Sequence, residues 1–284
     1  MNAPRFRVPL GLLASGAIGW AAYRRGSLSR SGVVGAMLVG TTIFASGGAA
    51  PSTLLITFFV SSSVLSRWKR ERKRIATSEF AKGERRDLAQ VLANGGVAAA
   101  LVALGRARPD TPWLPAFVGA IATVNADTWS TEAGTLSRQP PRLITTGKVV
   151  TAGTSGGATP LGTAAAALGA AAIGVVATLV GRPQRGDGSV VTPTFDGRAG
   201  ALPLATTAGL VGAFVDSLLG ATVQARYRCP ACGVPTERTR HRCGTPAVLI
   251  GGWRAIDNDA VNFLSSLCGA AVGWWWGQRS RHAG

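Results

Sequence analysis

The chain has 284 residues, of which 46% are hydrophobic and only 15% are charged, and its mean hydropathy is +0.23. This composition is too apolar for an ordinary soluble domain and predicts an integral membrane protein. The net charge of +17 suggests nucleic acid, but the basic residues gather in loops between apolar segments and lack interleaved aromatic residues. We therefore expect the bilayer, and no nucleic acid, as a partner of this chain.

Eight apolar segments approach the ~20 residues that a helix needs to cross a bilayer. They lie at about residues 8–23, 31–49, 51–67, 88–105, 113–126, 159–181, 201–223 and 258–276. The first lacks a convincing signal-peptide cleavage site, so we expect it to be a retained helix. The prediction is an all-α, polytopic bundle of about 6–8 transmembrane helices. It forms a single domain over 1–284 with one polar insert at 224–257. A soluble protein with buried core helices is disfavoured, because apolar segments occupy too much of the chain.

The basic residues predict how the bundle is oriented. The loop from Arg67 to Arg86 holds the strongest cluster of lysine and arginine, and positively charged loops face the cytoplasm. Counting spans outward from this loop places 24–30, 127–158 and 224–257 on the same side and 46–51 on the other. The segments with chemical potential are thus expected on the cytoplasmic face.

The first candidate site residues follow this loop. Gln90 and Asn94 are four residues apart, so they share one face of the predicted helix and present amide groups to a ligand. Arg86 precedes them and is a candidate phosphate contact. The general positivity of a cytoplasmic loop explains Arg86 equally well.

The fifth apolar segment ends in two carboxylates, Asp127 and Glu132. Because they are five residues apart, they would point in different directions on a regular helix. Gly134 and the hydroxyl side chains nearby predict a broken helix that lines a wet cavity, where irregular backbone is tolerated at membrane depth. A solvated loop is the alternative. An intramembrane carboxylate otherwise indicates a functional site.

A loop rich in glycine and hydroxyl groups then opens the next apolar segment. Its candidate phosphate ligands are Gly153, Thr154, Ser155, Gly156, Gly157 and Thr159. Their N–H groups and a helix dipole that begins near Pro160 would attract phosphate, and Lys148 would add a positive charge. Glycine-rich turns before membrane helices are common, so the loop is a stronger indication beside the two carboxylates than alone.

Asp216 lies inside the seventh apolar segment without a neighbouring basic residue. Beside the two earlier carboxylates it would complete an oxygen-rich site suited to Mg²⁺. Pairing with an arginine of another helix is the alternative. In the last apolar segment Asn258 and Asn262 share a helix face that would hydrogen-bond a ligand, while helix capping by Asp257 or Asn258 is the competing explanation.

The polar insert carries the pattern Cys-x₂-Cys-x₈-His-x-Cys, formed by Cys229, Cys232, His241 and Cys243. This spacing predicts a Zn²⁺ site, which we expect to be structural because a closed Cys₃His set leaves no coordination position for substrate. Ordinary cytosolic thiols are the alternative, and a disulfide is less expected in a cytoplasmic loop. Since the chain has only two histidines, a Ser-His-Asp hydrolase is disfavoured.

Several of these segments, in this order, resemble the family of transmembrane protein 19 and plant phytyl-phosphate kinase, an integral membrane domain of unknown function 92. The resemblance covers most of the chain from about Phe58 onward. It rests on Arg85–Gly96, Asn125–Gly134, Gly153–Gly162, Asp216–Gly220 and Asp257–Ser266. The Cys/His insert departs from the eukaryotic members and implies a bacterial-type branch, hence a bacterial inner or plasma membrane.

The resemblance implies an all-helical lipid kinase that transfers a phosphoryl group from CTP, or another nucleotide, to a prenyl monophosphate such as phytyl or geranylgeranyl phosphate. In this hypothesis Asp127, Glu132 and Asp216 hold Mg²⁺ that bridges the nucleotide phosphates. One rival is a CTP-dependent cytidylyltransferase acting on a lipid phosphate. Another is a membrane transporter, in which the acids line an ion path that is accessible from both faces. A purely structural protein would leave the three acids unexplained.

Overall fold

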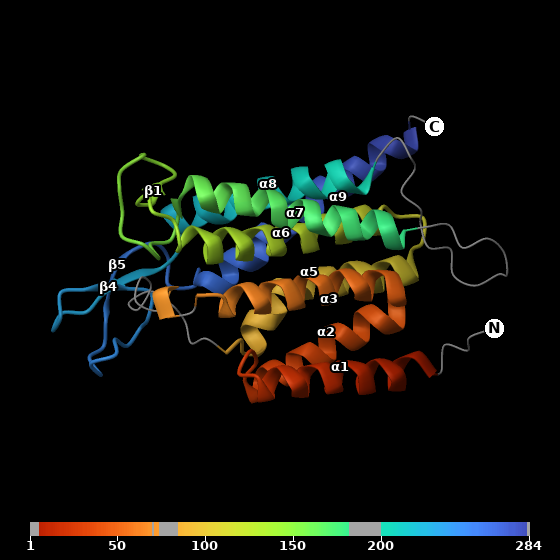
Figure 1. Ribbon diagram of the computed structural model, residues 1–284, viewed down its shortest axis with the longest axis horizontal. Helices are drawn as coiled ribbons and strands as arrows, with labels where there is room; N and C mark the ends of the chain where they lie inside the picture. Colours follow the sequence, from red (N-terminus) through yellow and green to blue (C-terminus); the bar gives the residue numbers. More distant parts are fainter. Residues whose placement is uncertain (1–5, 70, 74–84, 182–199, 283–284) are drawn as a thin grey trace.

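The computed structural model describes residues 6–69, 71–73, 85–181 and 200–282. Arg70, Arg74 and Lys82 of the predicted basic loop lie outside the described residues. The helices are α1 (Arg7–Arg24), α2 (Arg30–Gly47), α3 (Ala49–Arg67), α5 (Leu88–Ala107), α6 (Trp113–Gly134), α7 (Pro160–Val180), α8 (Ala201–Thr222) and α9 (Asn258–His282). Each predicted apolar segment coincides with one of these helices, which confirms the all-α class (Figure 1).

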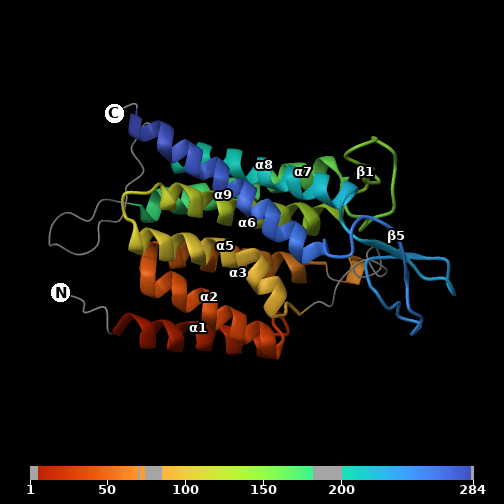
Figure 2. The ribbon, with the colours of Figure 1, turned by 180° about the vertical axis from the view of Figure 1, so that it is seen from behind.

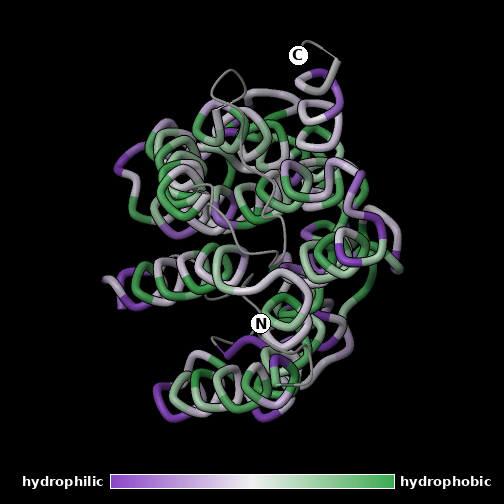
Figure 3. Tube along the Cα trace, turned by 90° about the vertical axis from the view of Figure 1, so that its right-hand side faces the viewer, coloured by the Kyte–Doolittle hydropathy of each residue, from purple (hydrophilic) through white to green (hydrophobic). Residues whose placement is uncertain are grey.

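The outer faces of the helices are apolar. Large hydrophobic side chains such as Leu13, Val60, Leu168 and Leu179 are exposed. In Figure 3 hydrophobic positions lie on both the inner and the outer sides of the helices. Of the described helices, α3, α5, α7 and α8 are long and apolar enough to cross a membrane. Because exposed apolar surface of this extent needs a cover, the chain is a multi-pass integral membrane protein.

Helix α6 lies at the centre of the bundle and packs against α3, α5, α7, α8 and α9. Near its end Asn125 is fully buried. Its Nδ2 donates to the Gly169 carbonyl of α7 at 2.7 Å, and its Oδ1 accepts from the Ser61 hydroxyl of α3 at 3.0 Å. A buried amide is costly without partners, so these bonds fix the position of α6 just before Asp127.

Small residues bring α6, α8 and α9 into close contact. A Cβ added to Gly212 of α8, or to Gly269 of α9, would collide with the side chain of Thr123. The Thr123 hydroxyl donates to the carbonyl of Ala208 at 3.1 Å and ties α6 to α8. Small side chains thus let these backbones approach, as expected for helices packed in lipid.

The strands lie at one end of the bundle, whereas α1 begins and α9 ends at the opposite end (Figures 1 and 2). In the loop after α6, β1 (Arg142–Leu143) pairs antiparallel with β2 (Gly157–Ala158). In the insert, β3 (Arg226–Arg228), β4 (Pro235–Thr236) and β5 (Val248–Gly251) form an antiparallel sheet in the order β4-β3-β5. The loop joining α1 and α2 is at this end too, so the segments that span counting placed on one side lie together.

The predicted break in α6 is wrong. The helix is continuous past Asp127 and ends at Gly134. The hydroxyl of Thr128 donates to the carbonyl of Val124 at 2.8 Å, within the same helix. Such bonds satisfy a polar side chain without opening the helix, so the hydroxyl-rich sequence does not require a bend.

Candidate functional site

A polar cavity of about 940 Å³ lies at the end of the bundle that carries the strands. Its walls come from the ends of the helices, the glycine loop and the insert. The predicted residues that line it are Arg86, Gln90, Asn94, Asp127, Glu132, Gly153, Thr154, Ser155, Gly156, Gly157, Thr159, Asp216, Asn258 and Asn262. Residues from five separate parts of the sequence therefore meet at one place.

Lys148 does not line this cavity, and its predicted role as a cation beside the phosphate loop is wrong. The residue is exposed in the turn between β1 and β2, where its carbonyl accepts from the backbone N–H of Leu143 at 2.9 Å. Positive charge reaches the cavity from other segments. The basic residues that line it are Arg25, Arg67, Lys73, Arg86, Arg238 and Arg242.

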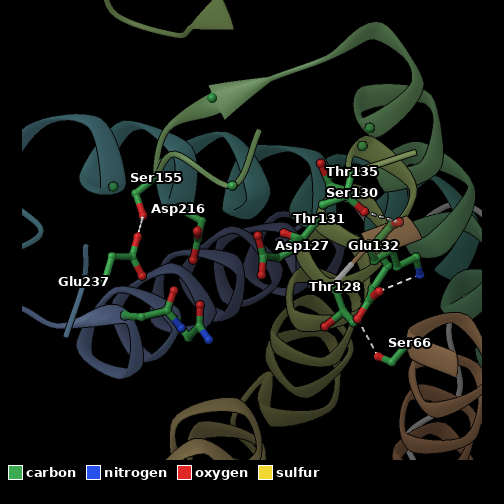
Figure 4. A pocket seen from close by; sticks show the side chains of 18 of the residues that line it. Ser66, Asp127, Thr128, Ser130, Thr131, Glu132, Thr135, Ser155, Asp216 and Glu237 are labelled. Atoms are coloured by element: carbon green, nitrogen blue, oxygen red, sulfur yellow. Dashed lines mark hydrogen bonds and ion pairs between the residues drawn. The ribbon is translucent and has the colours of Figure 1, made fainter. Parts of the chain in front are cut away.

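Asp127 of α6 and Asp216 of α8 face each other in the cavity (Figure 4). Ser265 of α9 donates its hydroxyl to Asp216 Oδ2 at 3.1 Å, which fixes one of the two carboxylates. The close contact of α6 with α8 brings the two acids together, although they are far apart in the sequence. Two facing carboxylates repel each other unless a proton or a cation lies between them. The pair is therefore suited to a divalent cation.

Glu132 lies away from this pair (Figure 4). Its Oε2 is 2.6 Å from Lys73 Nζ, and its Oε1 accepts from the Ser66 hydroxyl at 2.5 Å. On a continuous helix five residues amount to a rotation of about 140°, which separates the two acids of α6. The predicted three-carboxylate cluster is therefore wrong. Within the described parts of the chain, the acidic and metal-ligating side chains that converge as a group of three or more are those of the Cys/His set.

The glycine loop leads directly into α7. The helix begins at Pro160, as predicted, and Thr159 caps it by accepting from the Gly162 N–H at 3.0 Å. The cap occupies the Thr159 side chain, so an anion at this segment would be bound by the preceding loop and by the positive end of the helix dipole.

The loop is fixed against α8 at Gly156. This residue has a φ of +77°, and a Cβ there would collide with Ala221 of α8. Glycine is required on both grounds. The neighbouring Ser155 hydroxyl donates to the carboxylate of Glu237, so the loop is tied to the insert as well (Figure 4).

Glu237 and Gln224 are among the cavity residues that were not predicted from the sequence. Glu237 comes from the insert, and the available indication was that it is the only acid between residues 224 and 256. Gln224 follows the end of α8 and has a side chain that is 2% exposed. Its Nε2 has no hydrogen-bond partner among the described residues. A buried donor beside a cavity is placed to bond an acceptor supplied by a ligand or by water.

Of the amide side chains that were predicted to face a ligand, that of Gln90 also caps a helix, and those of α9 are available to the cavity. Gln90 and Asp87 form a reciprocal capping box at the start of α5. At α9 the cap is Asp257, whose Oδ1 accepts from the N–H groups of Asp259 and Ala260, at 3.1 and 3.0 Å. Because Asp257 is the cap, the side chains of Asn258 and Asn262 are available to the cavity.

Arg86 is held at the cavity by its backbone. Its N–H donates to the Ser27 carbonyl, and its carbonyl accepts from the Ser29 N–H, both at 3.0 Å. Burial lowers the pKa of the Arg86 guanidinium from its usual value, and the charge of Glu132 opposes this effect. The group remains a cation at neutral pH because the starting value is so high.

The four residues of the Cys/His pattern lie together in the insert, with their ligand atoms all within 4.8 Å of one another. Cys229 Sγ is 3.6 Å from Cys243 Sγ, and His241 Nδ1 is 3.1 Å from Cys243 Sγ. Thiolates that share a tetrahedral Zn²⁺ lie about 3.8 Å apart. Hydrogen bonding with Thr245, and then with His241, lowers the pKa of the Cys243 thiol to about 5, whereas hydrogen bonding with Cys243, and then with Cys229, raises the pKa of the Cys232 thiol to about 11. The set is able to hold a metal ion.

The chain matches a protein family and individual proteins along most of its length. The model of the family described as "Integral membrane protein DUF92" matches residues 13–270. The chain belongs to this family. It is similar to "Protein PGR" of Arabidopsis thaliana, with 33% identity over 280 residues that cover 94% of each chain. It is also similar to "Uncharacterized membrane protein MJ0933" of Methanocaldococcus jannaschii, with 33% identity over 247 residues, or 87% of this chain and 84% of the relative. No solved structure matches it significantly.

The family match confirms the resemblance found in the sequence motifs. The matched residues include all the cavity residues, from the loop after α1 to the start of α9. The insert lies within the matched range as well. The cavity is thus a feature of the DUF92 domain of this protein.

Proposed function

We propose that this DUF92 protein is a Mg²⁺-dependent lipid kinase. It transfers a phosphoryl group from CTP, or another nucleoside triphosphate, to a prenyl monophosphate such as phytyl or geranylgeranyl phosphate. The observation that carries the proposal is the facing pair Asp127 and Asp216, in a polar cavity that also contains the glycine loop. Metal-ligating carboxylates beside phosphate-binding backbone are what phosphoryl transfer requires.

The two facing carboxylates fit Mg²⁺. This ion is usually bound through one or two carboxylates together with waters and substrate phosphates, and it does not need a full set of protein ligands. Asp127 and Asp216 would hold it, and Ser265 fixes the second of them. Bound there, the ion would neutralise charge on the nucleotide phosphates during transfer.

The rest of the cavity favours a polyanion. Six basic and four acidic side chains line it, so positive charge is in excess by 6 − 4 = 2. Phosphate oxygens would supply the acceptor that Gln224 Nε2 lacks. Arg86 would donate charge-assisted hydrogen bonds to the same groups. Because a prenyl monophosphate already carries ionised oxygens, its attack on a nucleotide needs no strong general base.

The position of the cavity suits a lipid acceptor. Apart from glycine, Pro141 and Ala152 are the apolar residues among those that line it, so it is built for headgroups and not for a prenyl chain. It lies at one end of a bundle whose outer faces are apolar. A phosphate in the cavity would leave the prenyl chain in the bilayer. The concentration of arginine and lysine at this end supports a cytoplasmic cavity in a bacterial inner or plasma membrane.

The test is phosphoryl transfer by the full chain purified in detergent. We expect label from γ-³²P CTP, or from γ-³²P ATP, to enter a prenyl diphosphate only when Mg²⁺ is present. Asp127→Asn and Asp216→Asn should each lower the rate by about a thousandfold or more while the protein stays folded. Asp110→Asn, which changes an exposed acid outside the cavity, is the matched control.

The alternatives give different products. Label from α-³²P CTP in the lipid would identify a cytidylyltransferase. The absence of transfer from any donor to any prenyl phosphate, by protein shown to be folded, would remove the kinase and leave a transporter as the remaining hypothesis. Full activity of Asp127→Asn would remove the metal assignment.

The Cys/His set is a second proposed metal site. We infer that it binds Zn²⁺ in a structural role, because it offers a closed set of four ligands and none of the four lines the cavity.

A further inference from the structure

We propose that Zn²⁺ at the Cys/His set locks the insert in place as one wall of the cavity. The metal would have no contact with the substrate. It would act by holding in place the chain segment between its two pairs of ligands, and this segment carries residues that line the cavity. The nature of the anion in the cavity rests on the proposed function, whereas the metal site and its effect on the insert do not.

The ligands sit in two tight turns. In the first, the Gly233 N–H donates to the Cys229 carbonyl at 2.8 Å. In the second, the Gly244 N–H donates to the His241 carbonyl at 2.9 Å. Both glycines have a φ in the left-handed region, at +70° and +86°. The local backbone thus shapes each turn, and a metal ion is what would join one turn to the other.

The insert has a small sheet and a small hydrophobic core. Strand β4 has two residues, and the sheet of β4, β3 and β5 is small. The buried hydrophobic residues of the insert are Ala225, Tyr227 and Cys229. A core of this size does not keep a chain segment ordered, and small segments of this kind are usually stabilised by a metal.

The charged residues of the insert that reach the cavity lie between the ligands of the Cys/His set. Glu237 and Arg238 are between Cys232 and His241, and Arg242 is between His241 and Cys243. A metal that closes the two turns on each other therefore restrains all three. The insert supplies two of the six basic residues of the cavity and one of its four acids, so its position sets much of the local charge.

Glu237 joins the wall to the phosphate loop. Its carboxylate accepts from the Ser155 hydroxyl, and it lies on the Asp216 side of the facing pair (Figure 4). An insert released from zinc would loosen this contact and withdraw Arg238 and Arg242 from the ligand. We therefore expect loss of zinc to weaken the binding of an anion in the cavity without unfolding the helical bundle.

The first measurement is the metal content of the full chain, purified in detergent without added metal. We expect about one Zn²⁺ per chain. Cys232→Ser and Cys243→Ser should lose it, whereas Cys268→Ser, which changes the cysteine of α9 outside the set, should retain it. An unchanged zinc content in Cys232→Ser, or no zinc in the native protein supplied with the metal, would overturn the proposal.

The second measurement is the rate of tryptic cleavage after Arg238, Arg240 and Arg242. We expect chelation of zinc, or Cys232→Ser, to raise it by about tenfold or more, because a released segment opens more often. Cleavage after Arg142, an exposed residue of β1 outside the insert, should be unchanged and serves as the internal control. Equal cleavage of the insert with and without zinc would show that the metal does not hold it, and would contradict the proposal.

The third measurement is the binding of CTP with Mg²⁺. Chelation in the native protein should weaken it by about tenfold, and restored zinc should recover it, as two withdrawn arginines predict. Because this measurement uses the native protein, it does not depend on whether a variant folds. If zinc protects the insert from trypsin but no sample binds CTP, the role of zinc in holding the insert is supported and the proposed function is contradicted. CTP affinity that is unchanged while the insert opens would overturn the role of the wall in the cavity.

Discussion

The ion pair between Lys73 and Glu132 allows the carboxylate assignment to be tested by stability as well as by activity. At an Nζ–Oε2 distance of 2.6 Å and an effective dielectric constant of about 20, the Coulomb energy is about 6 kcal/mol. Desolvation of two buried ions offsets most of this, but removal of one partner leaves the other buried and typically costs about 3–5 kcal/mol. The Glu132 side chain keeps 22% exposure and a hydrogen bond from Ser66. For Lys73→Met we therefore expect a loss at or just below the low end of this range, about 2–3 kcal/mol of unfolding free energy.

A double-mutant cycle measures the pair directly. Lys73→Met and Glu132→Gln should each destabilise the protein, and the double variant should be more stable than the sum of the two losses by about 2 kcal/mol. Unfolding would be followed by circular dichroism during titration with sodium dodecyl sulfate in mixed micelles. Arg72→Met, which removes an exposed neighbouring charge, should have little effect and is the matched control. Strict additivity of the two single variants would refute the ion pair.

The same variants separate the two roles open to Glu132. If it pairs with Lys73 and does not bind metal, Glu132→Gln should leave the Mg²⁺ concentration for half-maximal phosphoryl transfer within about twofold of the native value. A metal ligand predicts an increase of about tenfold or more. Such an increase would show that the carboxylate leaves Lys73 when nucleotide binds, and would restore the cluster of three acids.

Two further predictions follow from positions that the structure separates. Lys148→Ala should leave the KM for CTP within about twofold of the native value, because Lys148 is exposed outside the cavity. Arg86→Gln should raise this KM about tenfold, because Arg86 lines the cavity and its replacement removes a charge-assisted hydrogen bond. Similar KM values for the two variants would contradict this assignment. Gly212→Leu should lower the thermal unfolding temperature, since overpacking against Thr123 costs about 1–3 kcal/mol. Gly96→Ala, where an added Cβ meets nothing within 4 Å, should instead be neutral or stabilising by about 0.5–1 kcal/mol. Equal unfolding temperatures for Gly212→Leu and Gly96→Ala would contradict the packing described for α8.

The sequence predicted the helices well because their cause is local. Each apolar segment must bury its backbone groups in lipid, and a helix does so with hydrogen bonds inside the segment. The approximate bounds of the helices could therefore be estimated from hydropathy alone. The break expected in α6 failed because hydroxyl side chains such as that of Thr128 found acceptors within the helix, and composition cannot tell this from a bend.

The four residues of the Cys/His set and the two acids of α6 could also be proposed from the sequence. Zinc ligands repeat at spacings set by a single turn, and a carboxylate in an apolar run is conspicuous because it is costly there. What these residues contact could not be read in the same way. Asp127 faces Asp216, whereas Glu132 pairs with Lys73. The two acids lie on different sides of α6 and therefore have different neighbours.

Hydropathy and short motifs by themselves determined that this is a helical membrane protein of the DUF92 family with acids in its apolar segments and a Cys/His insert. Only the tertiary structure decided the composition of the cavity, which includes Glu237 and Gln224 and excludes Lys148. The physical reason is one of range. Apolar transfer and ligand spacing act within a segment, whereas a cavity forms where helices far apart in the chain approach closely, and that approach depends on small residues such as Gly212 and Gly269 at their contacts.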